Sequence, residues 1–233
     1  MIFGRRVFAL SGGSAGVGER NSRTSRMGEQ GMGKTVFYIV LCYLSGSVLY
    51  ANVFGGLFGV RKRYAESADR NPGVTNAYKY GGFWCGTLTL VCELAKGALP
   101  VFCARFVPGL RDWAMPVIIA APVVGHVLPV FYDFRGGKGI AVTFGCLLGL
   151  FPYTRPLAIL AASFIFFSVV IKIYPHYYRT IAAFVFAGIA MLICPVRADV
   201  LASFLFDVAL VCLRLVLGHE EKEKFEVKLL WMR

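Results

Sequence analysis

Long apolar stretches separated by short polar loops make up most of this 233-residue chain. A membrane-spanning helix needs about 20 predominantly apolar residues. Seven stretches come close to that length or exceed it, and most charged side chains lie between them. The pattern predicts an all-α, polytopic membrane protein with about seven transmembrane helices. The predicted spans are residues 35–60, 81–106, 113–132, 139–153, 155–174, 178–196 and 199–217.

The loops between these spans predict the topology. A tight turn from Pro152 to Pro156 separates the short fourth span from the fifth, so six helices are the alternative count. Loops rich in Lys and Arg stay on the cytoplasmic side of a membrane. With residue 35 outside and counting from Met32, thirteen basic residues fall in the inner loops and tail and five in the outer loops; the five arginines of residues 1–31 would raise the outer count to ten. We therefore expect the N-terminus outside and the C-terminus in the cytoplasm.

The two ends of the chain differ from its apolar middle. Residues 1–31 are rich in Gly, Ser and Arg, and their longest apolar run is Val7–Leu10. A signal peptide needs about 7–15 apolar residues, so this stretch does not qualify. We expect residues 1–31 to be a disordered or mispredicted leader, residues 32–218 a single membrane domain, and residues 219–233 a charged cytoplasmic tail.

Composition agrees with a membrane protein and excludes other classes. Hydrophobic residues make up 57% of the chain and charged residues 16%, whereas soluble domains have about 45–50% and about 25%. Intrinsic disorder does not fit so few polar residues. A basic nucleic-acid module does not fit either, although the net charge is +12. The seven cysteines all lie in apolar stretches without metal-ligand spacing, so we expect no metal and no disulfide framework.

Three polar groups interrupt the first two thirds of the chain. In the first, Asn71, Gly73, Thr75 and Asn76 follow Arg70, with Lys79 close behind, and Asn-Pro-Gly predicts a turn. These amide, hydroxyl and basic groups could hold a phosphate or a polyol; the alternative is a solvated hairpin.

The second group is a glycine-rich loop around a single lysine. Gly136, Gly137 and Gly139 surround Lys138, and a helix is expected to begin near residue 139. Backbone N–H groups in such a loop can approach an anion, and a helix N-terminus favours negative charge. The spacing differs from that of a nucleotide-binding P-loop, because glycine rather than serine or threonine follows the lysine. A phosphate nest is the favoured interpretation, with a flexible turn as the alternative.

The third group consists of ionisable residues inside spans, which are costly there and often functional. Glu93 and Lys96 lie three residues apart and can meet on one helix face, as a functional or a structural ion pair. His126 is expected near the glycine-rich loop, as a phosphate contact or as a packing residue. We expect His176 to lie at the membrane interface, and Arg214 to reach the cytoplasmic edge.

These motifs together resemble the bacterial acyl-phosphate-dependent glycerol-3-phosphate acyltransferases. The resemblance covers about residues 38–145 in order and spacing, and continues weakly into the segment from Arg214 to Glu220. Its most specific part is the segment that runs from His126 to Gly139. The motifs that carry it are Gly46-Ser47, Asn71-x-Gly73-x-Thr75-Asn76, Glu93-x-x-Lys96-Gly97 and Gly125-His126 with Phe134-x-Gly136-Gly137-Lys138-Gly139.

The resemblance implies an enzyme of the bacterial inner membrane, with its site at the cytoplasmic face. Such enzymes transfer an acyl group from acyl phosphate to the 1-hydroxyl of glycerol 3-phosphate, giving lysophosphatidic acid, without a cofactor or metal. The implied partners are these two substrates and the lipid bilayer. The implied catalytic residues are Lys138, His126 and Asn76. The implied substrate- or phosphate-binding residues are Ser47, Asn71, Gly73, Thr75, Lys79, Lys96, Gly136, Gly137, Gly139 and Arg214.

The chain also departs from the pattern of this family. Asp69 replaces a serine, and Lys79 replaces an arginine, which keeps the charge but loses bidentate geometry. Val208 and Val211 stand where the family has a histidine and an asparagine. The missing histidine and asparagine leave a catalytically inactive scaffold relative as one alternative. A small anion or solute transporter that uses the basic loops as a gate is the other.

Overall fold

The computed structural model describes residues 14–67, 71–218 and 226–229, in which nine α-helices and two short strands form one helical body. Short 3₁₀ turns at Asp112–Ala114 and Val130–Tyr132 flank α5, and a π-helical turn at Phe166–Val170 follows α7. The helices are α1 (Ser14–Ser47), α2 (Tyr50–Leu57), α3 (Arg61–Ala65), α4 (Val74–Ala104), α5 (Met115–Val127), α6 (Ile140–Leu148), α7 (Arg155–Ile165), α8 (His176–Ile193) and α9 (Ala198–Leu217), and the strands are β1 (Ile171–Tyr174) and β2 (Glu226–Leu229).

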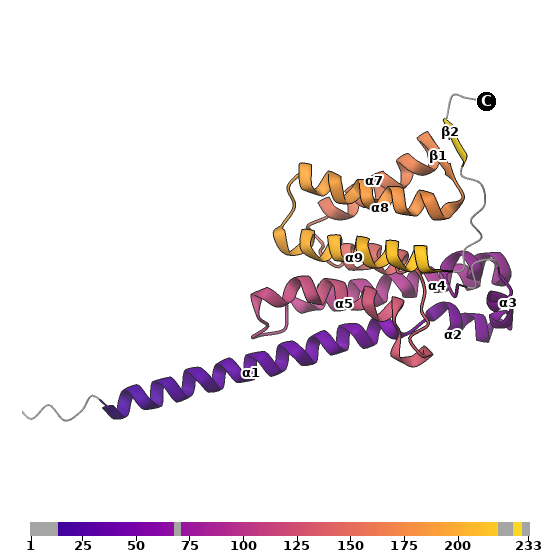
Figure 1. Cartoon of the computed structure of the whole chain (residues 1–233). Helices are drawn as coiled ribbons and strands as arrows, with labels where there is room; N and C mark the ends of the chain where they lie inside the picture. Colours follow the sequence, from indigo (N-terminus) through magenta and orange to yellow (C-terminus); the bar gives the residue numbers. More distant parts are fainter. Residues whose placement is uncertain (1–13, 68–70, 219–225, 230–233) are drawn as a thin grey trace, which may run out of the picture.

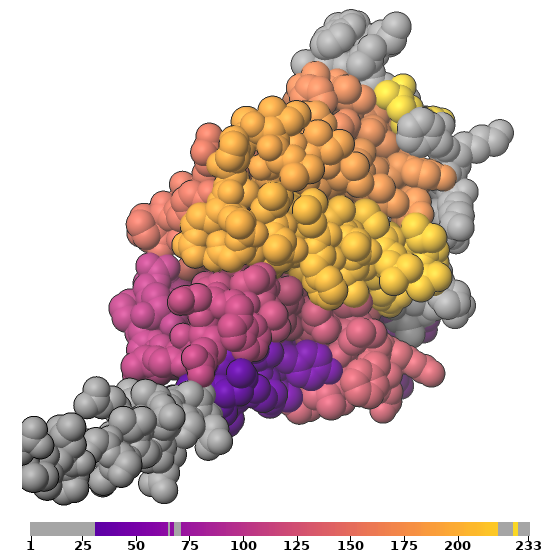
Figure 2. All heavy atoms as spheres, turned by 60° about the vertical axis from the view of Figure 1, so that its left-hand side comes forward, coloured from indigo at the N-terminus to yellow at the C-terminus, as the bar shows by residue number. Residues whose placement is uncertain are grey.

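The long helices pack side by side in an order that differs from their order in the chain. Helix α1 packs on α5, α5 on α9, α9 on α8, and α8 on α7, while α4 packs on α6 (Figure 1). Figure 2 shows the same stacking on one surface, where α9 lies between α8 and α5. The first half of α1 projects beyond the other helices in Figure 1.

Five helical segments in the described part of the chain are long and apolar enough to cross a membrane: Gly31–Leu57, Val74–Ala104, Asp112–Tyr132, His176–Ile193 and Ala198–Leu217. Large apolar side chains cover their outer surfaces, and Trp84 is 68% exposed and Ile193 74%. A surface this apolar suits lipid rather than water. The predicted helical membrane protein agrees with these findings at that level.

The fifth predicted span, 155–174, is wrong at its end, and one short pair of strands adds to an otherwise helical structure. The helical part ends at Val170, and Ile171–Tyr174 form β1, which pairs antiparallel with β2 in the C-terminal tail. Both segments alternate apolar and polar residues, which is the strand period. Pro175 adds to this, because the residue before a proline is pushed towards extended backbone.

Two further predictions concern the start of the membrane domain and the length of the fourth span. The expected leader includes residues 14–31, which belong to α1, while residues 1–13 lie outside the described residues, so the boundary at residue 32 stays a prediction. Helix α6 has only nine residues, or about 14 Å at 1.5 Å per residue. It begins after the glycine-rich loop and packs along the second half of α4, where Gly145 lies on Leu94 and Gly149 on Ala98.

Glycines allow the closest helix contacts. A Cβ on Gly46 would collide with the Pro122 carbonyl group, and a Cβ on Gly125 with the Tyr43 carbonyl oxygen, so α1 and α5 touch backbone to backbone. Small residues at such crossings are a common basis of helix association in membranes. The packing of α1 on α5 therefore depends on these two positions.

We expect Gly125→Ala to destabilise the protein by about 1–3 kcal/mol, because the new methyl group has no space between α1 and α5. Thermal unfolding of the purified protein in detergent measures the effect. Gly56→Ala is the matched control, since a Cβ on Gly56 in α2 meets no atom within 4 Å. Equal melting temperatures for the two variants would contradict this account of the α1–α5 contact.

Candidate functional site

One cavity of about 580 Å³ lies where the ends of four helices meet. Its polar wall comes from the loop before α4, the glycine-rich loop before α6 and the start of α8. Its apolar wall comes from α4 and α6. The lining residues are Asn71, Gly73, Val74, Thr75, Asn76, Leu90, Glu93, Leu94, His126, Lys138, Gly139, Ile140, Ala141, Phe144, Pro175, His176 and Tyr177.

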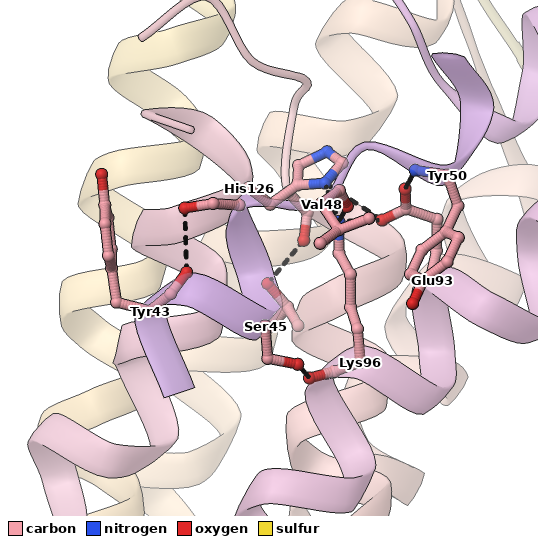
Figure 3. A network of polar contacts seen from close by, with 10 residues as sticks. Tyr43, Ser45, Val48, Tyr50, Glu93, Lys96 and His126 are labelled. Atoms are coloured by element: carbon pink, nitrogen blue, oxygen red, sulfur yellow. Dashed lines mark hydrogen bonds and ion pairs between the residues drawn. The ribbon is translucent and has the colours of Figure 1, made fainter. Parts of the chain in front are cut away.

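A buried cluster of three ionisable side chains lies at the inner side of this cavity. Glu93 and Lys96 project from the same face of α4, and His126 comes from α5 (Figure 3). Glu93 Oε2 lies 2.7 Å from Lys96 Nζ and 3.0 Å from His126 Nδ1. All three residues are at most 5% exposed. The ion pair predicted from the i, i+3 spacing of Glu93 and Lys96 is therefore present, and His126 lies against the same carboxylate.

The same cluster holds the break between α1 and α2. Lys96 Nζ donates to the Val48 carbonyl oxygen at 2.6 Å, and the Tyr50 N–H donates to Glu93 Oε1 at 3.1 Å. Helix ends leave backbone groups without intrahelical partners, and in a membrane these groups must be satisfied inside the protein. The ion pair thus replaces the helical hydrogen bonds that the break removes (Figure 3).

The glycine-rich loop lies directly on His126. The Gly137 N–H donates to the His126 carbonyl oxygen at 3.1 Å, and a Cβ on Gly136 or Gly137 would collide with His126. Arg214 of α9 donates to the Gly136 carbonyl oxygen at 2.9 Å. Gly139 has φ +84°, in the left-handed region that favours glycine, and α6 begins after it. Close packing against His126 therefore accounts for glycine at positions 136 and 137. The loop also brings Lys138 to the cavity.

The loop before α4 is fixed by Asn76, a buried residue. Its amide donates to the Asn71 carbonyl oxygen at 2.8 Å and to Ser67 Oγ at 3.1 Å. Ser67 Oγ in turn donates to the Tyr64 carbonyl oxygen at 2.6 Å. These bonds hold the turn around Gly73, so that α4 begins at the cavity wall.

The structure brings about half of the predicted site residues to the cavity and places the others around it. Ser47 is buried and donates to the Tyr43 carbonyl oxygen, and exposed Lys79 lies over the Tyr80 ring. Four more do not line the cavity but contact residues or backbone next to it: Lys96, Gly136, Gly137 and Arg214. Asp69 and Arg70 lie outside the described residues. The predicted residues that line the cavity are Asn71, Gly73, Thr75, Asn76, His126, Lys138 and Gly139.

Sequence reasoning placed His176 at the membrane interface and missed that it lines the same cavity as Lys138. It is the first residue of α8 and follows Pro175. The signal for it was weak, since a lone histidine after a proline has no spacing that ties it to the glycine-rich loop. Only the packing of α8 against α7 and α9 brings it there.

The residues that line the cavity suit a ligand with both a phosphate group and an apolar chain. Lys138 supplies positive charge, and the Asn71 and Thr75 side chains add neutral polar groups beside the N-terminus of α6, which favours anions. Leu90, Ile140 and Phe144 line the apolar wall. Within the described ranges no group of three or more His, Cys, Asp or Glu could hold a metal ion.

Comparison with known proteins places the chain among enzymes of one kind. Residues 36–224 match the family described as glycerol-3-phosphate acyltransferase. The glycerol-3-phosphate acyltransferase of Pseudomonas aeruginosa is 40% identical over 124 residues, which are 53% of this chain and 63% of that protein. That of Pasteurella multocida is 37% identical over 112 residues, 48% of this chain and 55% of that protein. The matched region therefore spans less than two thirds of these relatives.

Two solved structures share the fold. Both are crystal structures of PlsY (YgiH), an integral membrane glycerol 3-phosphate acyltransferase, in a glycerol 3-phosphate form and a lysophosphatidic acid form. They superpose with TM-scores of 0.66 and 0.65 at 26% identity, over 77% of this chain and 87% of theirs. The resemblance inferred from the motifs is thus confirmed, as is a helical, multi-pass membrane protein.

We expect removal of one partner of the buried ion pair to cost about 3–5 kcal/mol, because it leaves a charge without its counter-ion in a dry environment. Glu93→Gln and Lys96→Met should each lower the melting temperature in detergent, and the double variant should lose less than the sum of the two. Lys34→Met, at an exposed lysine of α1, is the control. Strictly additive losses would show that the two side chains do not interact.

Proposed function

The chain belongs to the glycerol-3-phosphate acyltransferase family, and on that basis we propose that it transfers a fatty acyl group from acyl phosphate to the 1-hydroxyl of glycerol 3-phosphate. The products are lysophosphatidic acid and phosphate. The observation that carries the proposal is one shared cavity, in which Lys138 and the polar loop before α4 meet the apolar wall of α4 and α6.

Acyl phosphate is an activated mixed anhydride, so the protein mainly has to position two phosphate-bearing substrates and stabilise developing charge. Lys138 and the N-terminus of α6 would hold a phosphate group. Asn71, Thr75 and Asn76 would contact the glycerol phosphate, and the apolar wall would take the first part of the acyl chain. His126 and the glycine-rich loop keep this arrangement rigid, and no cofactor takes part.

The proposed setting is the inner membrane of a bacterium, with seven membrane segments, the N-terminus outside and the cavity at the cytoplasmic face. The short helix Arg155–Val170 and the nine-residue α6 would add to the five longer segments. The distribution of basic residues supports this orientation. Further support comes from the polar loops around Asn71, Lys138 and His176, which line one cavity and therefore lie on one side.

The experiment supplies the purified protein with palmitoyl phosphate and glycerol 3-phosphate and measures lysophosphatidic acid. Lys138→Ala should lower kcat/KM by about 10²-fold or more, because it removes a charge that stabilises the reacting phosphate. Lys138→Arg should keep part of the activity, since the charge remains but its geometry changes.

Lys34→Ala, at an exposed lysine of α1 that does not line the cavity, controls for a general loss of positive charge. An inactive wild-type protein would favour the alternative of a non-catalytic relative. Val208 and Val211 raise that alternative, because they stand where the family has a histidine and an asparagine. An active Lys138→Ala variant would contradict the role of this lysine.

A further inference from the structure

We propose that the basic corner of the molecule, made by Arg61, Lys62 and Arg63 of α3, binds the headgroup of an anionic phospholipid. These three residues follow one another directly after α2, and all three side chains are exposed. The basic corner is separate from the cavity, because none of the three belongs to its lining. Lipid binding here therefore does not depend on acyl transfer.

The cations of the basic corner have no counter-ion in the described part of the chain. Within those ranges no hydrogen bond or ion pair joins them to another residue, and the nearest carboxylate in the sequence, that of Glu66, is exposed and not bonded to them. By contrast, exposed Arg197 is paired with Asp199. Guanidinium groups bind phosphate with two N–H donors at once. A phosphate group is therefore the counter-ion that suits the basic corner.

The packing of Tyr64 directs the three basic side chains outwards. Tyr64 is 2% exposed, and its ring lies so close to α2 that a Cβ on Gly55 would come within 2.5 Å of it. The ring of Tyr80 from α4 lies against it, with the centroids 6.4 Å apart. Val60, just before the basic residues, would be 3.3 Å from a Cβ on Gly81. Helix α3 is thus fixed to α2 and α4 by one face and presents its charges on the other.

Exposed apolar side chains lie next to the basic corner. Leu57 and Phe58 precede it at the end of α2. Phe83 and Trp84 follow Gly81 on α4, and their exposed rings meet edge to face with centroids 5.3 Å apart. Tryptophan collects at the level of the lipid headgroups in membrane proteins. Cations at that level can reach a headgroup while the neighbouring apolar side chains contact its acyl chains.

This combination favours a lipid over a soluble acidic partner. The membrane segment Gly31–Leu57 ends four residues before Arg61, and Figure 1 shows α2 and α3 together at one end of the body. Basic residues directly after a membrane helix attract anionic lipids, and an adjacent apolar surface adds to the binding. A soluble acidic partner would leave the apolar side chains beside the basic corner without a contact.

The test is native mass spectrometry of the full chain in a neutral detergent, titrated with phosphatidylglycerol or with phosphatidylcholine. Phosphatidylglycerol should bind more tightly, and its advantage should shrink as ionic strength rises. One variant combines Arg61→Gln, Lys62→Gln and Arg63→Gln. It should bind phosphatidylglycerol about 10²-fold more weakly, at about fivefold for each basic residue, and bind phosphatidylcholine as before.

Two further variants separate charge at this place from charge in general. Arg61→Lys with Arg63→Lys keeps the charge and should keep the preference for phosphatidylglycerol. The matched control combines Lys34→Gln, Arg155→Gln and Arg197→Gln, which removes three exposed basic residues elsewhere. This control should bind both lipids as the wild type does.

Equal affinities of the wild type for the two lipids would overturn the proposal. So would unchanged phosphatidylglycerol binding in the variant that lacks all three cations, or an equal loss in the matched control. Inorganic phosphate is added in a separate titration to distinguish a lipid headgroup from a free anion. It should not displace the lipid, and displacement would show a site for free anions instead and so contradict the proposal.

Discussion

The ion pair of Glu93 and Lys96, with His126 as its neighbour, is the interaction on which the rest of the structure depends. It joins α4 to α5, and through the carbonyl of Val48 and the N–H of Tyr50 it also holds the break between α1 and α2. Burying three ionisable groups is costly unless each is paired. The arrangement meets that condition, and its geometry fixes where four helices meet.

The cavity follows from that arrangement. Because His126 is held by Glu93, its ring and carbonyl offer a fixed surface on which Gly136 and Gly137 pack. The loop then delivers Lys138 to the cavity at the start of α6. The position of Lys138 in the cavity therefore depends on side chains that do not line it, such as Lys96. Such positioning residues can matter as much as the groups that bind substrate.

Sequence periodicity predicted the parts of the fold that depend on long apolar runs, as in α9, because burial in lipid and helix length are local properties. It failed at Ile171–Tyr174, since a strand that pairs with a tail more than 50 residues away has only a weak local signal. The ion pair of Glu93 and Lys96 was predictable from helical spacing. The presence of His126 in the same cluster and of His176 at the cavity was not, because both depend on how helices distant in sequence pack.

The most direct test of this account is a structure of the protein bound to glycerol 3-phosphate in a lipid environment. We predict that the phosphate group lies in the cavity between the loop before α4 and the start of α6, with Lys138 Nζ at about 2.7–3.2 Å from a phosphate oxygen. The 1-hydroxyl should then face the middle of the cavity, while Glu93, Lys96 and His126 keep their contacts. A phosphate bound away from Lys138, or a cluster that opens on binding, would contradict the account.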